Sequence, residues 1–396
     1  MKTYYFLLIA LFSLMGCTSR TQPTTAYDAV EADVQVEVIP SDDTLKLSDI
    51  YTTAYDIVAF HPVVLSYISD IIKYDSTWIV WGQCAEGHIL QFDGRGAYCK
   101  TLLGIGNGPK EAVDVISMKL YGNSLYCLVN YGTELLKLNL TDGSEEWRMR
   151  MPDTICSAAD FEPLSENQFL FLKSVYRGSP THESRLYAYD RTANRILAER
   201  LELDRRTGQY ISFGQKNCLY RYRDSIRYYE VFRKGILQYN DTRLDLQGYL
   251  SFVENVYSFP DDRLFGEYTF ESFIETCEES PYIWAHSNLY EGERFITSVF
   301  RYRHHLYLNV IDKCSSRSHS YRWMRDDIVT DAVTPVEEGL SRLAVAGRVH
   351  YYTLSYDCLS RLIESKPASG FNQQLQDATA GMNEDANDLV ICLYEK

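Results

Sequence analysis

Short runs of apolar residues, each closed by a polar turn, recur along most of this chain. Residues 75–115 show the unit clearly, with apolar runs at 78–81, 89–92 and 97–103. The turn Asp93-Gly94 follows the second run. Runs this short, separated by Asp-Gly turns, predict antiparallel β-hairpins. Long segments with helical periodicity are absent, so the pattern predicts an all-β protein.

The second of these runs returns at a nearly constant spacing. Similar runs end at Asp93, Asn139, Asp190 and Asn240, which gives steps of 46, 51 and 50 residues. A repeat of this length with several strands in each unit is typical of a β-propeller. Blades of roughly 50–60 residues predict six blades over residues 34–396, with seven as the alternative. A β-sandwich would not produce a constant step, and a parallel β-helix needs shorter coils.

The end of the chain departs from the strand pattern. Phe371, Leu375 and Ala378 share one helical face, which predicts a short amphipathic helix before the last strand at 389–394. Open sheet edges invite aggregation, so a ring of sheets needs its first and last blades joined. We therefore expect the first strand, at 34–39, and the last strand to lie in the same closing blade.

The N-terminus carries a targeting segment. Lys2 is followed by an apolar stretch at 4–14 that is too short to span a bilayer, and Leu14-Met15-Gly16-Cys17 resembles a bacterial lipobox. We interpret residues 1–16 as a lipoprotein signal peptide, Cys17 as the lipid attachment site and residues 17–33 as a flexible tether. The alternative is an ordinary secretory signal. Because no acidic residues directly follow Cys17, we favour the periplasmic side of the cell envelope.

Composition excludes some classes of partner. The net charge of −15 disfavours nucleic acid and anionic lipid headgroups, so membrane contact is expected only through the lipid. The 32 Tyr, 17 Phe and 5 Trp suit strands, which accommodate large rings.

Besides Cys17 there are nine cysteines, and none forms a Cys-x-x-Cys pair. We favour buried free thiols over a disulfide framework, because a chain of this length needs no covalent staples.

Three stretches carry a resemblance to a known family. They are 36–50, with its Val-Glu-Val-Ile-Pro and Leu-Ser-Asp-Ile; 89–111, with Phe-Asp-x-x-Gly and Gly-x-Gly-x-Gly-Pro-x-Glu; and the acidic turn at 383–390. With these, the chain resembles a family of Gram-negative lipoproteins described as 6-bladed β-propellers. Lys110 stands where that family more often has Gly, and Asp388 where it more often has Pro. The resemblance implies six blades and an envelope location. It implies no reaction, and a fold by itself gives no function.

The Gly-rich stretch 104–111 is the main candidate site. Its spacing matches neither a dinucleotide fingerprint nor a phosphate loop, so no nucleotide cofactor is expected. The glycines fit a crossing from one blade to the next. In the functional interpretation, this crossing lines a mouth of the central channel, where Asn107, Lys110 and Glu111 would face a ligand or partner.

Metal and catalytic motifs are incomplete. His182-Glu183 lacks the second His of a zinc protease, and His304-His305 would face opposite sides of a strand. The acidic turn at 383–388 lacks the Gly of a calcium loop. No metal and no cofactor is therefore expected.

Asp-Ser and Asp-Thr pairs offer possible O-glycosylation at Thr44, Ser76, Thr154 and Ser225, although such pairs are also ordinary turn residues.

These observations favour a lipid-anchored envelope propeller that binds a ligand, such as a glycan, or a protein partner. The alternative is a propeller enzyme, a hydrolase or lyase that acts on a glycan or small molecule in the central channel. Binding is favoured because no nucleophile motif, metal cluster or acid/base pair stands out in the sequence.

Overall fold

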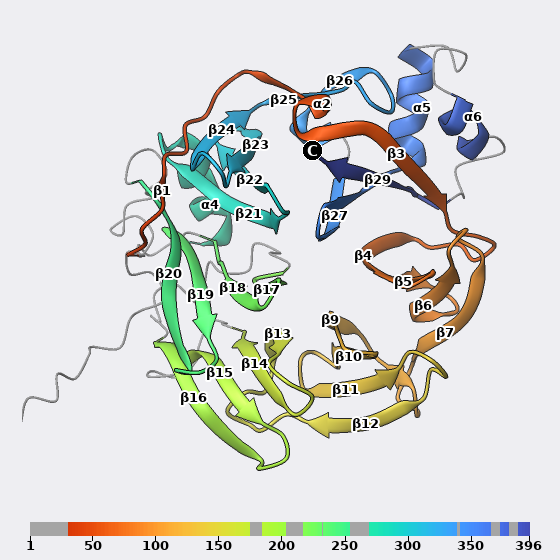
Figure 1. Ribbon diagram of the computed structural model, residues 1–396, viewed down its shortest axis with the longest axis vertical. Helices are drawn as coiled ribbons and strands as arrows, with labels where there is room; N and C mark the ends of the chain where they lie inside the picture. The colour runs from red at the N-terminus through yellow and green to blue at the C-terminus, as the bar shows by residue number, and fades with distance from the viewer. Residues whose placement is uncertain are drawn as a thin grey trace, which may run out of the picture.

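The structure is a computed structural model that describes residues 31–174, 184–202, 217–231, 233–253, 269–338, 341–365, 373–379 and 387–396. These residues form an all-β propeller of seven sheets arranged around a central axis (Figure 1). The sequence predicted this architecture, with seven blades as its alternative count. Six of the sheets have four or five strands, and the seventh has three.

The first four large sheets follow the chain in order, each with its first strand nearest the axis (Figure 1). Their antiparallel strands are β4 (Tyr67–Tyr74), β5 (Thr77–Cys84), β6 (Gly87–Asp93) and β7 (Tyr98–Ile105); β9 (Val115–Tyr121), β10 (Ser124–Val129), β11 (Glu134–Asn139) and β12 (Glu145–Arg150); β13 (Ala158–Pro163), β14 (Gln168–Lys173), β15 (Ser184–Asp190) and β16 (Arg195–Glu202); and β17 (Leu219–Tyr222), β18 (Ser225–Tyr228), β19 (Gly235–Asn240) and β20 (Asp245–Phe252). Short strand β8 (Glu111–Ala112) adds to β7 in parallel.

The remaining sheets complete the ring. The fifth consists of β21 (Ile283–Glu291), β22 (Phe295–Tyr302), β23 (His305–Asp312) and β24 (Arg317–Tyr321). The sixth consists of β27 (Ser341–Ala346), β28 (Val349–Leu354), β29 (Leu389–Glu395) and β3 (Tyr51–Ala59). Between them lies the three-stranded sheet of β2 (Thr44–Lys46), β25 (Trp323–Asp326) and β26 (Ala332–Pro335) (Figure 1).

Closure joins the two ends of the chain, but through a different strand from the one predicted. Strand β29 pairs antiparallel with β3, with Leu389 opposite Ala59. The first described strand, β1 (Gln35–Val36), instead pairs in parallel with β20 in the fourth sheet. The expectation that residues 34–39 join the closing blade was therefore wrong. The sequence has two strand-like runs near its start, and only tertiary pairing decides which one meets β29.

The repeat that was visible in the sequence marks the third strand of each of the first four sheets. Asp93, Asn139, Asp190 and Asn240 are the last residues of β6, β11, β15 and β19. Each side chain accepts a backbone hydrogen bond from the following turn, as in Ala97 N to Asp93 Oδ1 at 2.9 Å. An Asp or Asn at this position thus closes the outer hairpin of the blade.

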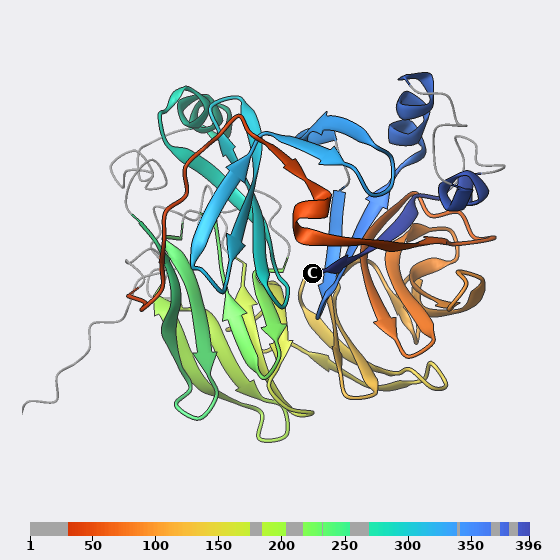
Figure 2. The same cartoon turned by 45° about the horizontal axis from the view of Figure 1, so that its top comes forward.

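The few helices of the structure are α2 (Leu47–Ile50), α4 (Phe270–Glu279), the 3-10 helix η1 (Val336–Glu338), α5 (Tyr356–Ser365) and α6 (Gln373–Thr379). Of these, α5 and α6 lie outside the ring of sheets (Figures 1 and 2). Helix α6, with Leu375 buried, confirms the predicted C-terminal helix. Helices α4 and α5 were not predicted. They interrupt the 50-residue step, which is why the repeat blurs after residue 250.

Apolar side chains fill the spaces between neighbouring sheets. One cluster joins the first sheet to the second through Ile79, Leu103, Leu125 and Leu136, all fully buried or nearly so. The nine described cysteines are all free thiols, and five of them are buried, at 84, 127, 218, 277 and 392. The prediction of buried free thiols is thus confirmed for these five, which serve as small apolar side chains, whereas Cys99 and Cys314 are exposed.

Candidate functional site

The Gly-rich loop lies at the outer edge of the first sheet, between β7 and β8. Strands β7 and β8 are the outermost strands of this sheet. The Lys110 backbone N–H donates to Glu145 Oε2 at 3.3 Å on the outermost strand of the second sheet. Placement of Asn107, Lys110 and Glu111 on a channel-facing rim was therefore wrong. Binding of a partner by Asn107, Lys110 and Glu111 stays a prediction, now for an outer surface.

The glycines of this motif have a structural role. The carboxylate of Glu111 folds back into the loop and accepts the Gly108 N–H at 2.8 Å. A Cβ atom at Gly106 would collide with this carboxylate, and Gly106 also has a φ of 143°. The loop then leads into β9 of the second sheet, which confirms the interpretation of the glycines as a blade crossing.

The centre of the ring holds a cavity of about 260 Å³. Strands β4, β9, β13, β17, β21 and β27, one from each of the six larger sheets, contribute to its wall, so residues far apart in sequence meet there. The polar side chains on the wall are Asp70, Lys119, Glu162, Asn217, Tyr220, Arg221, Tyr290 and Glu291. Apolar side chains such as Met118 and Val345 lie between them. Charged side chains from five of these strands thus meet around one cavity.

On one side of the cavity, Lys119 lies between two buried carboxylates. Its Nζ is 3.6 Å from Asp160 Oδ1 and 3.8 Å from Glu162 Oε2, and it donates to the Leu219 carbonyl at 2.8 Å. Burial acts to lower the pKa of Lys119, but the two carboxylates outweigh it and raise the pKa. Lys119 is therefore held as a cation.

Glu162 is held between Lys119 and Arg221. Arg221 Nε donates to Glu162 Oε1 at 3.0 Å. Burial raises the pKa of Glu162, and the two nearby cations oppose this shift without cancelling it. Glu162 therefore takes up a proton more readily than an ordinary glutamate, while still facing the cavity.

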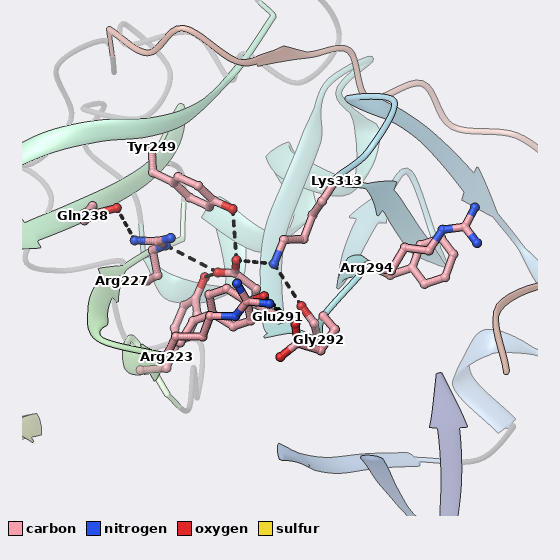
Figure 3. A network of polar contacts seen from close by, with 12 residues as sticks. Arg223, Arg227, Gln238, Tyr249, Glu291, Gly292, Arg294 and Lys313 are labelled. Atoms are coloured by element: carbon pink, nitrogen blue, oxygen red, sulfur yellow. Dashed lines mark hydrogen bonds and ion pairs between the residues drawn. The ribbon is translucent and has the colours of Figure 1, made fainter. Parts of the chain in front are cut away.

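On the opposite side, Glu291 is the centre of a second cluster (Figure 3). Its carboxylate accepts Lys313 Nζ at 2.8 Å, the Tyr249 hydroxyl at 3.0 Å and the Tyr220 hydroxyl at 3.2 Å. Arg227 Nε lies 3.5 Å away. The Glu291 side chain is fully buried, so these contacts replace its lost hydration.

Tyrosines in this cluster stay protonated. Burial raises the pKa of Tyr249 to about 12, and the charge of Glu291 adds to the shift. The same two causes raise the pKa of Tyr220 well above its usual range. Both hydroxyls can therefore only donate to Glu291, which fixes their orientation around the cavity.

Other sequence-predicted positions have mixed outcomes. Cys17, His182-Glu183 and the acidic residues 383–386 lie outside the described residues. His304 contacts Glu278 at 3.4 Å, and His305 contacts Arg322 at 3.3 Å, so the pair does not converge. Within the described ranges, no three His, Cys, Asp or Glu side chains are grouped to hold a metal ion. No described helix combines the length and apolar character needed to cross a membrane.

Of the possible glycosylation sites, Thr44, Ser76 and Thr154 are exposed and Ser225 is half-buried. Their modification stays a prediction.

Sequence reasoning missed the charged residues of the channel. The available signal was a charge inside otherwise apolar strands, such as Lys119 within β9 and Glu291 at the end of β21. The sequence shows these charges one at a time. Ring closure alone brings them together.

One family matches almost the whole of this propeller. It is described as a domain of unknown function, DUF4934, and it covers residues 33–394. The chain belongs to the DUF4934 family. No curated protein matches it in sequence.

Solved structures with a similar fold include a protein of Bacteroides fragilis described as a putative exported protein. It is 15% identical, with 91% of this chain and 99% of that chain covered and a TM-score of 0.70. At this identity the likeness shows the fold alone. Two further structures are more distant. BamB from Moraxella catarrhalis is 10% identical, with 94% of this chain and 97% of that chain covered and a TM-score of 0.37. The RRP9 WD40 repeats are 8% identical, with 88% of this chain and 99% of that chain covered and a TM-score of 0.43. The DUF4934 chain thus shares its propeller fold with the exported protein of Bacteroides fragilis.

Proposed function

We propose that this protein is a lipid-anchored envelope propeller that binds a small, hydroxyl-rich molecule such as a sugar in its central cavity. The observation that carries the proposal is the cavity of about 260 Å³ walled by one strand from each of the six larger sheets. A concave site with a few convergent polar groups on a rigid scaffold is the usual form of a ligand site.

The chemistry of the wall favours a neutral ligand. Carboxylates and cations lie side by side, as in the Lys119–Glu162 and Arg221–Glu162 contacts. Such a wall offers both donors and acceptors without a large excess of either charge. Hydroxyl groups, which donate and accept, match it better than a strongly charged molecule. The tyrosines at 220 and 290 add aromatic surface for the carbon face of a ring.

The test fills the cavity without disturbing the core. Val345 lines the cavity, and it is half-buried. We expect Val345→Trp to abolish binding to a glycan array, with the detergent-solubilised protein as the probe. Val333→Trp is the matched control, because Val333 on β26 is 57% exposed and is not part of the cavity wall. Equal glycan binding by both variants, or no glycan binding by the unchanged protein, contradicts the proposal.

The anchor is supported by the lipobox-like sequence ending at Cys17 and by the similarity to a putative exported protein. We expect Cys17→Ala to release the protein from the membrane fraction and to remove incorporation of labelled fatty acid. Membrane retention of this variant would contradict lipid attachment. A soluble propeller that still binds glycans would leave the ligand proposal intact.

An enzyme is the second candidate, because Glu162 faces the cavity with a raised pKa. A general acid needs this property near neutral pH. We expect Glu162→Gln to retain glycan binding if the protein only binds. Release of reducing ends from an array-positive glycan by the unchanged protein, lost in this variant, would favour the enzyme instead.

A protein partner would use a different surface. Ile105, Val113 and Tyr131 are large apolar side chains that are 49%, 41% and 68% exposed. They lie beside the loop of Asn107 and Lys110, because β8 pairs with β7 and the Tyr131 N–H donates to Asp114. Tyr131→Ser should reduce envelope pull-down of such a partner and leave glycan binding unchanged.

A further inference from the structure

A second cavity, of about 190 Å³, lies between the fifth sheet, the three-stranded sheet and the sixth sheet. One part of its wall is apolar and includes Val299, Leu308 and Met324. The other part is polar and includes Thr297 and Arg342. It is separate from the central cavity, although Tyr290 contributes to both walls. The Tyr290 hydroxyl donates to the Arg342 carbonyl at 3.3 Å, which fixes it between the two.

Arg342 brings a charge to this cavity and has no carboxylate in contact with it among the described residues. Its Nε donates to the Tyr352 hydroxyl at 3.0 Å, and its Nη2 donates to the hydroxyls of Tyr352 and Tyr51. Its Nη1 is buried and has no hydrogen-bond partner. Across the described part of the chain, no carboxylate comes within ion-pair distance of Arg342. This differs from Arg221 and Arg227, which both contact a glutamate.

The groups around Arg342 are neutral. Tyr51 contacts the Tyr352 hydroxyl at 2.8 Å and His350 Nδ1 at 3.1 Å. Burial raises the pKa of Tyr51 well above its usual range, so the phenol keeps its proton. Burial, together with the charge of Arg342, lowers the pKa of His350 well below its usual range. The Glu395 carboxylate lies beyond His350, 3.8 Å from His350 Nε2, and not in contact with Arg342. The groups hydrogen-bonded to Arg342 are therefore neutral, and a buried charge without a counter-charge in contact is costly.

A second polar group on the same wall also lacks a partner. Thr297 is 1% exposed, and its Oγ1 makes no hydrogen bond. Buried polar groups in proteins almost always have a partner, so an unpartnered one beside a cavity points to a missing ligand. The two residues that carry such atoms, Arg342 and Thr297, both line one cavity.

We propose that this cavity binds a small carboxylate with an apolar tail. The carboxylate accepts from Arg342 Nη1 and from Thr297, while the tail packs on Val299, Leu308 and Met324. Arg is well suited to this contact, because charge-assisted hydrogen bonds to carboxylates are short and strong. The single positive charge of Arg342 matches a ligand with a single negative charge. The exposed Glu337 at the cavity wall would repel a dianion.

The volume sets the size of the ligand. A cavity of about 150 Å³ lined by apolar residues binds benzene. At about 190 Å³, this cavity accommodates a slightly larger molecule, of the size of hexanoate. The site is independent of the sugar site proposed for the central cavity.

The test compares two probes that share a tail and differ in charge. Isothermal titration of the full, detergent-solubilised protein with sodium hexanoate should give saturable binding. Binding of 1-hexanol should be at least about tenfold weaker, because it lacks the charge that pairs with Arg342. Absence of saturable hexanoate binding, or equal affinity for the alcohol, overturns the proposal.

Variants locate the site. Arg342→Gln should weaken hexanoate binding by about tenfold or more, and the isosteric Thr297→Val should weaken it less. Val345→Trp, which fills the central cavity, should leave hexanoate binding unchanged. Unchanged affinity in a folded Arg342→Gln protein overturns the proposal. If that variant does not fold, Thr297→Val decides the question, since its failure to weaken binding would overturn the proposal as well.

Discussion

The clusters around the buried Glu291 and the half-buried Arg342 both lie beside the fifth sheet, but their charges are compensated differently. Glu291 is fully buried and has two cations and two tyrosine hydroxyls around its carboxylate. Arg342 has tyrosine hydroxyls on two of its nitrogens and no carboxylate. In the first cluster the chain supplies its own counter-charges, whereas in the second, within the described part of the chain, Arg342 Nη1 has no hydrogen-bond partner and Arg342 has no carboxylate in contact.

This difference separates a structural role from a binding role. Removal of one member of a compensated cluster leaves the other charges buried without a counter-charge, which lowers the free energy of unfolding. Removal of an uncompensated charge also removes the desolvation penalty of that charge, so stability should change little. The two clusters should therefore respond in opposite ways to substitution, and the following experiments measure this.

Deletion of residues 389–396 should have the largest effect. It removes β29, which joins β28 to β3 and thereby holds Tyr352 near Tyr51. We expect the truncated protein to lose its cooperative thermal transition, because the ring opens and exposes two strand edges. Removal of Lys396 alone, which is exposed, is the control. A melting temperature equal to that of the full chain would show that closure does not depend on β29.

Glu291→Gln should lower the free energy of unfolding by about 3 kcal/mol or more, because it leaves the buried Arg227 and the half-buried Lys313 without their carboxylate. Chemical denaturation at pH 7 measures this. Glu293→Gln is the control. Glu293 pairs with Arg223, whose side chain is 66% exposed, so the loss should stay below about 1 kcal/mol. Similar losses in the two variants would contradict the structural role of Glu291.

His350 should make the Arg342 cluster sensitive to acid. The pKa of His350 is well below its usual range in the folded protein, so the unfolded chain binds a proton first as pH falls. The contribution of His350 to the free energy of unfolding is therefore present in full above about pH 6.5. Below that pH, it decreases by up to about 1.4 kcal/mol for each pH unit. Stability curves from pH 7 to 5 should be shallower for His350→Gln and unchanged for His61→Gln, since His61 is exposed. An unchanged slope in His350→Gln would show that His350 does not stay neutral.

Arg342→Met should have the smallest effect on stability, within about 1 kcal/mol of the unchanged protein or slightly stabilising. The hydroxyls of Tyr51 and Tyr352 still hydrogen bond to each other without Arg342. Arg227→Met is the matched control, with an expected loss of about 3 kcal/mol, because Arg227 compensates Glu291. A large loss of stability in Arg342→Met would show that Arg342 has a structural role and that other residues of the chain compensate its charge.

The fold was predictable from the sequence to the extent that it depends on local patterns. The third strands that end at Asp93, Asn139, Asp190 and Asn240 were found because the Asx turn is a local requirement. The site was not predictable. The most motif-like loop, around Lys110, lies at the outer edge, where its glycines make room for the carboxylate of Glu111.

The sequence by itself determined the β-strand repeat, the C-terminal helix and the free thiols, because alternation, turn chemistry and composition are properties of short segments. Only the tertiary structure decided that β3 closes the ring, that Lys119, Glu162 and Glu291 share one cavity, and that Arg342 has no carboxylate beside it. These facts depend on distances between residues up to several hundred positions apart. Whether a buried charge is compensated is set by which strands meet, and no short segment of the chain carries that information.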